Sequence, residues 1–174
     1  MQIYHPDMNR LLIMRHGKSD WSSNAGSDFE RPLAKRGVKT AGKIGNWILQ
    51  NSLSPDIIVS SPALRAKSTA RIMCEAFKRP ETDIVYDERI YNADVDNLLA
   101  VITDHVGKES VLLIGHNPGL DELLDYLSNE KPGRNKNGKL MTTAAVAILV
   151  YDDPEEVTRQ AGAKLEKLVR PKDL

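Results

Sequence analysis

The sequence predicts an α/β protein, a three-layer sandwich with a mostly parallel central sheet between two layers of helices. Short apolar runs alternate with longer segments of helical periodicity along the chain. The runs at 11–14 and 111–114 are apolar at every position, which is typical of strands buried on both faces. A length of 174 residues suits one domain with a full core, so we expect a single domain over 1–174.

The first strand follows a polar lead-in. Residues 1–9 form this lead-in, and we expect His5 at the surface. A strand is predicted at 10–14, and a long polar loop then runs to Pro32, a length that commonly belongs to a functional site. From 33 to 50, apolar residues recur at three- and four-residue spacing and predict a helix. Its predicted buried stripe is Val38, Ala41, Ile44 and Ile48.

Three glycines stand in this helix: Gly37, Gly42 and Gly45. Each weakens an interior helical position by up to about 1 kcal/mol relative to alanine. Small residues would let the helix approach the sheet closely, so we expect that role for them.

The middle of the chain repeats the strand–helix pattern twice. The β-branched run at 56–59 predicts a strand. Ser60-Ser61-Pro62 then supplies a capping serine and a first-turn proline, which begin a helix that ends near Phe77. A strand at 84–86 and a helix from about 95 to 105 follow.

The last part of the chain adds three strands. After the buried run at 111–114, a leucine stripe predicts a helix to about 127. A strand is predicted at 144–151, a turn of helix at 154–159, and a last edge strand at 164–169 that could be antiparallel. Between them, the loop 129–141 is polar and its segment Lys131 to Lys139 is basic. It fits either a solvated flexible loop or a basic lid or partner-contact loop.

The composition excludes several classes of function. The 24 basic and 24 acidic side chains leave a formal net charge of zero, which gives no global field to attract nucleic acid or an anionic membrane. The single cysteine, Cys74, cannot form an internal disulfide and is expected to be buried in a helix. No apolar run is long enough for a transmembrane helix and no signal-peptide core stands at the N-terminus, so we expect a cytoplasmic protein.

Three strand exits deliver charged or titratable side chains to one expected edge of the sheet. Arg15 and His16 follow the first strand, Arg65 lies in the first turn after the second, and His116 follows the run at 111–114. In open α/β sheets, ligands bind at the carboxyl ends of the strands. Two arginines and two histidines without matching acids suit a dianion such as a phosphoryl group.

Other phosphate chemistries lack their sequence motifs. There is no phosphate-loop lysine motif, no glycine-rich kinase loop and no acidic pair for magnesium. No His-Glu-x-x-His or paired-cysteine motif predicts a zinc site, and no Gly-x-Ser-x-Gly elbow predicts a serine nucleophile. We therefore expect neither a metal nor a cofactor.

The ordered set of motifs resembles the histidine phosphatase superfamily, which has the phosphoglycerate mutase-like fold. The resemblance covers nearly the whole chain, and it is nearest to the small SixA-type branch of phosphohistidine phosphatases. The motifs that carry it are Arg15-His16-Gly17, Arg31-Pro32-Leu33 with Gly37, Ser60-Ser61-Pro62 with Arg65 and Thr69-Ala70, Gly115-His116-Asn117-Pro118, and Arg170-Pro171-Lys172-Asp173-Leu174.

The resemblance implies a role for each catalytic residue. His16 would be the nucleophile and become a phosphohistidine, which requires a neutral ring with its other nitrogen held as a donor. Arg15 and Arg65 would bind the phosphoryl oxygens. His116, protonated or as an N–H donor, would stabilise charge on the equatorial oxygens. Water would then release phosphate.

The residues that would protonate an alkoxide leaving group match the family's pattern poorly. Asp87 and Glu88 are the candidate general acids, and a plain surface charge fits Glu88 slightly better. Ser22 stands where the mutases have an asparagine near the phosphate, and Thr40 where they often have glutamine. Both differences argue against a sugar-phosphate mutase, although Ser22 is kept as a candidate phosphate-binding residue.

These observations predict a metal-independent phosphatase that acts on phosphohistidine in a protein partner, such as a phosphorelay domain. An imidazole leaving group needs less proton assistance than an alkoxide, which agrees with the weak provision of an acid. Two alternatives stay open: hydrolysis of a small phosphoester or phosphoanhydride, and a non-catalytic module that binds phosphorylated proteins.

Overall fold

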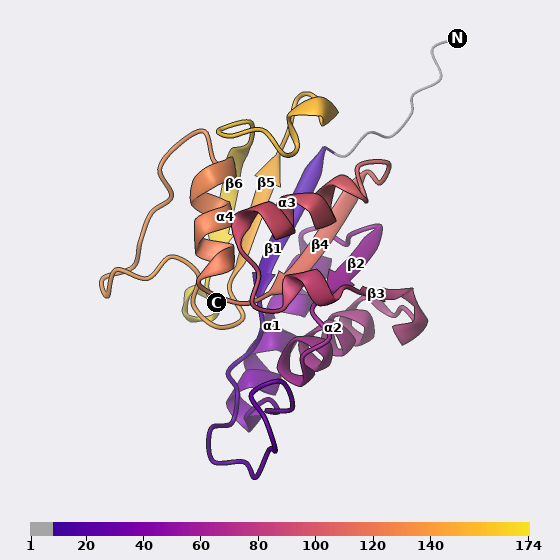
Figure 1. The fold of residues 1–174 in the computed structure, drawn as a ribbon, viewed down its shortest axis with the longest axis vertical. Helices are drawn as coiled ribbons and strands as arrows, with labels where there is room; N and C mark the ends of the chain where they lie inside the picture. Colours follow the sequence, from indigo (N-terminus) through magenta and orange to yellow (C-terminus); the bar gives the residue numbers. More distant parts are fainter. Residues whose placement is uncertain (1–8) are drawn as a thin grey trace.

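A six-stranded sheet forms the centre of the computed structural model, which describes residues 9–174 (Figure 1). The order of its strands is β3-β2-β4-β1-β5-β6. The strands are β1 (Arg10–Arg15), β2 (Ile57–Ser60), β3 (Ile84–Tyr86), β4 (Ser110–Gly115), β5 (Val146–Val150) and β6 (Lys164–Val169). The helices are α1 (Lys35–Gln50), α2 (Leu64–Phe77), α3 (Val95–Thr103) and α4 (Gly119–Leu127).

Four strands of the sheet are parallel and two pairings are antiparallel. β4 pairs in parallel with both β1 and β2, and β2 pairs in parallel with β3. β5 is antiparallel to β1, and β6 is antiparallel to β5. The segment after α4 returns the chain to the edge where β1 ends, because Val146 pairs with Met14. The predicted antiparallel edge strand is confirmed, but the antiparallel direction of β5 was not foreseen.

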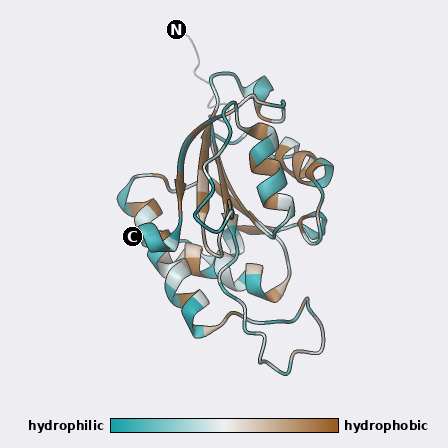
Figure 2. Cartoon of the chain, turned by 90° about the vertical axis from the view of Figure 1, so that its left-hand side faces the viewer, coloured by the Kyte–Doolittle hydropathy of each residue, from teal (hydrophilic) through white to brown (hydrophobic). Residues whose placement is uncertain are grey.

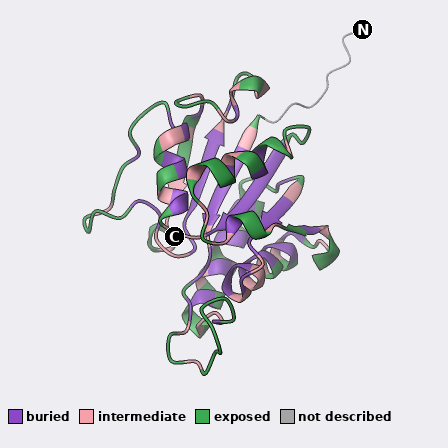
Figure 3. Cartoon of the chain, viewed as in Figure 1, coloured by how far each residue is buried: buried purple, intermediate pink, exposed green. Residues whose placement is uncertain are grey.

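Successive side chains of a strand point to opposite faces of the sheet, so the buried strands divide the core into two layers. Leu11 and Ile13 of β1 face α3 and α4, in a cluster that includes Leu98 and Leu123. Leu12 and Met14 face α1 and α2, in a second cluster. Figure 2 shows apolar strands between amphipathic helices, and Figure 3 shows buried strands with exposed loops at both ends. The predicted three-layer α/β architecture is therefore confirmed.

The predicted element boundaries need small corrections. α1 begins at Lys35 rather than at residue 33, and α3 ends at Thr103 rather than at 105. Val38 is 48% exposed, so its place in the buried stripe of α1 was wrong. The buried face includes Gly37 and Gly45 instead, because the helix packs closely there.

Three other predictions concern single residues or segments. Cys74 is buried, as expected. The expected lead-in with His5 lies outside the described residues, apart from its last position. Among the helices of residues 9–174, none is long and apolar enough to cross a membrane.

Candidate active site

Three strand ends bring His16, Arg65 and His116 together. His16 follows β1 and His116 follows β4, and these strands pair in parallel with Arg15 opposite Gly115. The ring centroids of the two histidines are 5.1 Å apart. Arg65 comes from the first turn of α2, and its Nε donates to Nε2 of His16 at 3.3 Å. The cluster therefore lies at the carboxyl edge of the parallel strands, where ligands bind in this kind of sheet.

The hydrogen bonds of His16 determine which ring nitrogen carries the hydrogen. Its Nδ1 lies 2.6 Å from the carbonyl oxygen of Gly17. A carbonyl only accepts, so Nδ1 carries the hydrogen and donates it. Nε2 then carries no hydrogen, and its single in-plane electron pair accepts the hydrogen bond from Arg65 inside the cluster. The ring is held as a nucleophile would have to be.

Burial keeps His16 neutral. Removal from water lowers the pKa of His16 to about 3, and the nearby His116, Arg65 and Arg15 add to this shift. The hydrogen bond to the Gly17 carbonyl opposes the shift but is outweighed. At neutral pH the electron pair on Nε2 is therefore available for reaction.

The second histidine, His116, is neutral as well. Burial, followed by the charge of Arg65, lowers the pKa of His116 to about 4. Its Nε2 lies 2.8 Å from the hydroxyl oxygen of Ser61, while its buried Nδ1 has no hydrogen-bond partner among residues 9–174. Of the two forms expected for His116, burial favours the neutral ring. In the tautomer that carries its hydrogen on Nδ1, this ring can donate a hydrogen bond to an anion.

A carboxylate from the loop after β1 joins two arginines. Asp28 accepts from Nη2 of Arg65 at 3.0 Å and from Nη2 of Arg31 at 2.6 Å. The hydroxyl of Tyr91 donates to the same carboxylate at 2.8 Å. Burial alone would raise the pKa of Asp28, but the hydrogen bonds from Tyr91 and Arg65 and the charges of both arginines lower it to about 2. Asp28 is therefore ionised and orients Arg65 toward His16.

Arg15 lies at the end of β1 and ties the site to the loop before β5. Its Nη1 donates to the carbonyl oxygen of Met141 at 3.1 Å, and Nδ2 of Asn117 donates to the same oxygen. The backbone N–H of Met141 donates to Asp121. The buried Nε of Arg15 has no partner among the described residues, so Arg15 keeps a donor for an anion.

Ser22 and the two candidate general acids form no hydrogen bond with this cluster. Ser22 is exposed, and its hydroxyl donates to Asp20. Asp87 pairs with Arg89, and the hydrogen bond from Arg89 holds the pKa of Asp87 below its usual value. Glu88 is exposed. In this structure neither Asp87 nor Asp28 is protonated at neutral pH.

Several neighbours of the cluster were not assigned a role by the sequence. Sequence reasoning assigned no role to Asp28 or Tyr91, and Arg31 entered only as part of a motif. The spacing of Asp28 and Arg31, three residues apart and of opposite charge, was the available signal. The contact of Asp28 with Arg65 spans 37 positions, and no local pattern predicts it.

The fold and this cluster define a class: an α/β protein that presents a neutral histidine to an anion site. The chain from residue 11 to 99 matches the model of the histidine phosphatase superfamily (branch 1). The phosphohistidine phosphatase SixA of Escherichia coli is 31% identical over 83% of this chain and 86% of its own. An uncharacterised chloroplastic protein of Arabidopsis thaliana is 26% identical over 93% of this chain and 78% of its own.

A solved structure supports the same conclusion. The protein histidine phosphatase SixA in complex with tungstate superposes with a TM-score of 0.77 at 25% identity, covering 94% of this chain and 98% of that one. The chain therefore belongs to the histidine phosphatase superfamily, has the phosphoglycerate mutase-like fold and is a phosphatase. The resemblance to the SixA-type branch is confirmed.

Proposed function

We propose that this phosphatase transfers the phosphoryl group of its substrate to Nε2 of His16 and then to water. The observation that carries the proposal is the state of the His16 ring. Its Nδ1 donates to the Gly17 carbonyl, and its unprotonated Nε2 directs its electron pair at Arg65, one of the proposed phosphate-binding residues. A group held in this way can attack phosphorus without prior deprotonation.

The reaction proceeds in two displacements. The electron pair of Nε2 forms a bond to phosphorus, and the bond from phosphorus to the leaving group breaks. The leaving group departs with that electron pair. A water oxygen then attacks the phosphorus of phosphohistidine, the P–N bond breaks, and its electron pair returns to His16. The water proton leaves to solvent and inorganic phosphate is released.

Neighbouring side chains stabilise the phosphoryl group during its transfer. Arg15 and Arg65 bind phosphoryl oxygens with guanidinium N–H groups, which match that geometry. Nδ1 of His116 donates to an equatorial oxygen as negative charge develops there. Ser22 remains a candidate phosphate-binding residue, although its exposed hydroxyl is bonded to Asp20.

We propose phosphohistidine on a protein, such as a phosphorelay domain, as the substrate. The ionised state of Asp28 and Asp87 supports this choice, because neither can protonate an alkoxide. An imidazole leaving group needs less of that help. The SixA relative carries the same activity in its name.

Metal independence and a cytoplasmic location belong to the same proposal. Among residues 9–174, no group of three or more His, Cys, Asp or Glu side chains is placed to hold a metal ion. The location remains an expectation from the sequence, since the relative from Arabidopsis thaliana is described as chloroplastic.

The deciding experiment measures phosphate release without added metal from a phosphohistidine protein and from an aryl phosphate. We expect fast release from phosphohistidine and loss of at least about a thousandfold in His16→Ala, because the nucleophile is gone. His105→Ala removes a histidine outside the cluster and is expected to keep the wild-type rate. Full turnover by His16→Ala would overturn the mechanism. A preference for the aryl phosphate that depends on Glu88 or Asp87 would overturn the proposed substrate.

A further inference from the structure

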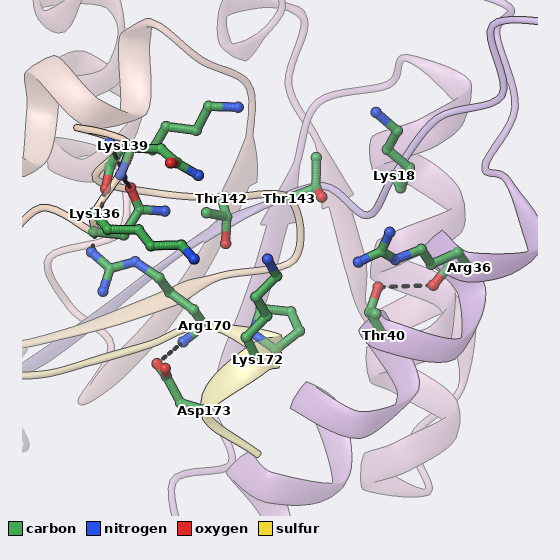
Figure 4. A pocket seen from close by; sticks show the side chains of 13 residues that line it. Lys18, Arg36, Thr40, Lys136, Lys139, Thr142, Thr143, Arg170, Lys172 and Asp173 are labelled. Carbon is green, nitrogen blue, oxygen red and sulfur yellow. Dashed lines mark hydrogen bonds between the residues drawn. The ribbon is translucent and has the colours of Figure 1, made fainter.

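A cavity lies near the segment that carries His16, because Lys18 is one of its lining residues. It has a volume of about 400 Å³ and is lined by residues from four separate segments of the chain (Figure 4). These segments are the loop after β1 at Lys18, the first turns of α1, the loop before β5, and the residues after β6. None of His16, Arg65 and His116 lines it, so it is distinct from the site already described.

The side chains that line this cavity are mostly cationic. Figure 4 shows basic side chains on opposite walls of the cavity, with one more between them. We call these six residues the basic pocket: Lys18, Arg36, Lys136, Lys139, Arg170 and Lys172. The only lining carboxylate is Asp173, which accepts a hydrogen bond from the backbone N–H of Arg170.

The six cations of the basic pocket have no ion-pair partner within the described residues. None of the six side chains forms an ion pair with a carboxylate of residues 9–174. The whole chain is neutral, so this concentration of cations is local. Like charges gathered around one cavity repel one another, and an anion between them would relieve that repulsion.

Helix α1 adds to the positive potential. Cations are unfavourable at a helix N-terminus, where the macrodipole is already positive. α1 nevertheless has Lys35 and Arg36 in its first turn, has no acidic residue there, and has no side-chain cap at Ala34. The N-terminal turn of α1 therefore lacks the negative partner that most helices carry, and Arg36 lines the pocket.

One member of the basic pocket also holds its wall in place. Nε of Arg170 donates to the carbonyl oxygen of Leu140 at 3.0 Å, and its Nη2 donates to that of Gly133 at 2.7 Å. The loop that supplies Lys136 and Lys139 is thus tied to the end of β6. The side chains of Lys136 and Lys139 are exposed, so both interpretations of this loop stay predictions.

We propose that the basic pocket binds a compact small molecule that carries two or more phosphate groups. A single phosphate contacts only a few cations, whereas several clustered phosphates can pair with cations on opposite walls at once. The hydroxyl groups of Thr142 and Thr143 also line the cavity and can donate to phosphate oxygens. A volume of about 400 Å³ lies within the range of small-molecule pockets.

The basic pocket shares its walls with the segment that carries His16. Lys18 stands two positions after His16, and Thr142 and Thr143 precede Ala144. The backbone N–H of Ala144 donates to the carbonyl oxygens of Arg15 and His16. A bound polyphosphate would therefore contact both sides of the segment that holds the nucleophile. Its binding does not depend on the phosphatase mechanism proposed above.

Calorimetric titration with inorganic tripolyphosphate at physiological salt tests the proposal. The pocket variant is Lys136→Gln/Lys139→Gln/Lys172→Gln, and the control variant is Lys78→Gln/Lys108→Gln/Lys164→Gln. All six lysines are exposed, and the control lysines do not line the pocket. We expect the pocket variant to bind roughly tenfold more weakly or worse, because three direct charge contacts are lost. The control variant is expected to stay within about twofold of wild type, since distant charges are screened.

Several outcomes would contradict the proposal. Equal affinity and stoichiometry in wild type and pocket variant would mean that tripolyphosphate binds only at the His16 site. Equal weakening of both variants would mean a general charge effect. Tighter binding of a polyglutamate peptide than of tripolyphosphate, lost in the pocket variant, would make the pocket a docking site for an acidic protein. Circular dichroism of each variant excludes unfolding as the cause.

Discussion

Asp28 orients the guanidinium group of Arg65. Its carboxylate and its backbone carbonyl oxygen both accept from the guanidinium of Arg65, at 3.0 Å and 2.7 Å. Nε of Arg65 is thereby directed toward His16. Arg31 is buried, stacks over the ring of Trp21 and is held by the same carboxylate. One acidic side chain thus positions two cations at the edge of the site.

Replacing this carboxylate tests whether it positions the arginines. We expect Asp28→Asn to lower kcat/KM for an aryl phosphate by roughly tenfold, because hydrogen bonds between charged groups are stronger than neutral ones and a neutral amide is a weaker acceptor than a carboxylate. Tyr91→Phe removes only one of the hydrogen bonds to Asp28 and is expected to lower kcat/KM by less than about fivefold. A rise in kcat/KM for Asp28→Asn would instead mean that the carboxylate competes with phosphate for the arginines.

At the scale of single residues, the sequence allowed us to predict those site residues whose positions follow strands. His16 and His116 directly follow strands, and Arg65 lies in the first turn of the helix that follows β2. Parallel strands end at one edge of the sheet. Asp28 could not be found in this way. It lies in a loop without periodicity, and its contacts with Arg65 and Tyr91 join residues that are distant along the chain. Such contacts arise only when the tertiary structure forms.

Among the elements, α1 packs against the loop after β1 through backbone rather than side chains. A Cβ at Gly37 would lie 2.1 Å from the carbonyl oxygen of Lys18, and one at Gly17 would lie 2.8 Å from that of Gly37. At Gly45 the neighbours are Ala76 and Met73 of α2. The expected close approach of α1 to the sheet is thus a close approach to the loop after β1 and to α2. At Gly42 nothing lies within 4 Å of the added Cβ.

These contacts make Gly37 and Gly42 a matched pair within α1. We expect Gly37→Ala to lower the free energy of unfolding by roughly 1–3 kcal/mol and to lower kcat, because backbone must shift beside His16. Gly42→Ala is expected to raise the free energy of unfolding by roughly 0.5–1 kcal/mol, since alanine is the better helix former and the space is free. Urea denaturation and steady-state kinetics measure both. Equal effects at the two positions would contradict this account of the packing.

Whether a segment forms a helix or a strand was predictable because the sequence signals for it are local. The direction of each strand in the sheet was less predictable. The apolar runs of β1 and β4 and the leucine stripe of α4 depend only on neighbouring residues. The antiparallel direction of β5 depends on where the loop after α4 delivers the chain. That loop is held by distant contacts, among them the bond of Arg15 to the Met141 carbonyl, so no local pattern determines it.

The whole molecule responds to pH through its two buried histidines. Burial, and the charge of Arg65, hold the pKa of His16 at about 3 and that of His116 at about 4, whereas in the unfolded chain both return to about 6.5. Between these values the unfolded state binds more protons than the folded state. The free energy of unfolding therefore rises with pH across this window. The stabilisation is complete above pH 6.5 and is lost as pH falls toward the folded-state values.

We therefore expect the protein to lose stability between pH 7 and pH 5, by at most about 2 kcal/mol for each of the two histidines. The variant His16→Gln/His116→Gln has no titrating ring in the cluster, so its free energy of unfolding should change less over this interval. His105→Gln, outside the cluster, should keep the wild-type dependence. Urea denaturation at both pH values measures the three proteins. If wild type and the double variant changed alike, the two rings would have to be titrating normally in the folded state. The neutral nucleophile on which the proposed mechanism depends would then be only partly populated near pH 6.5.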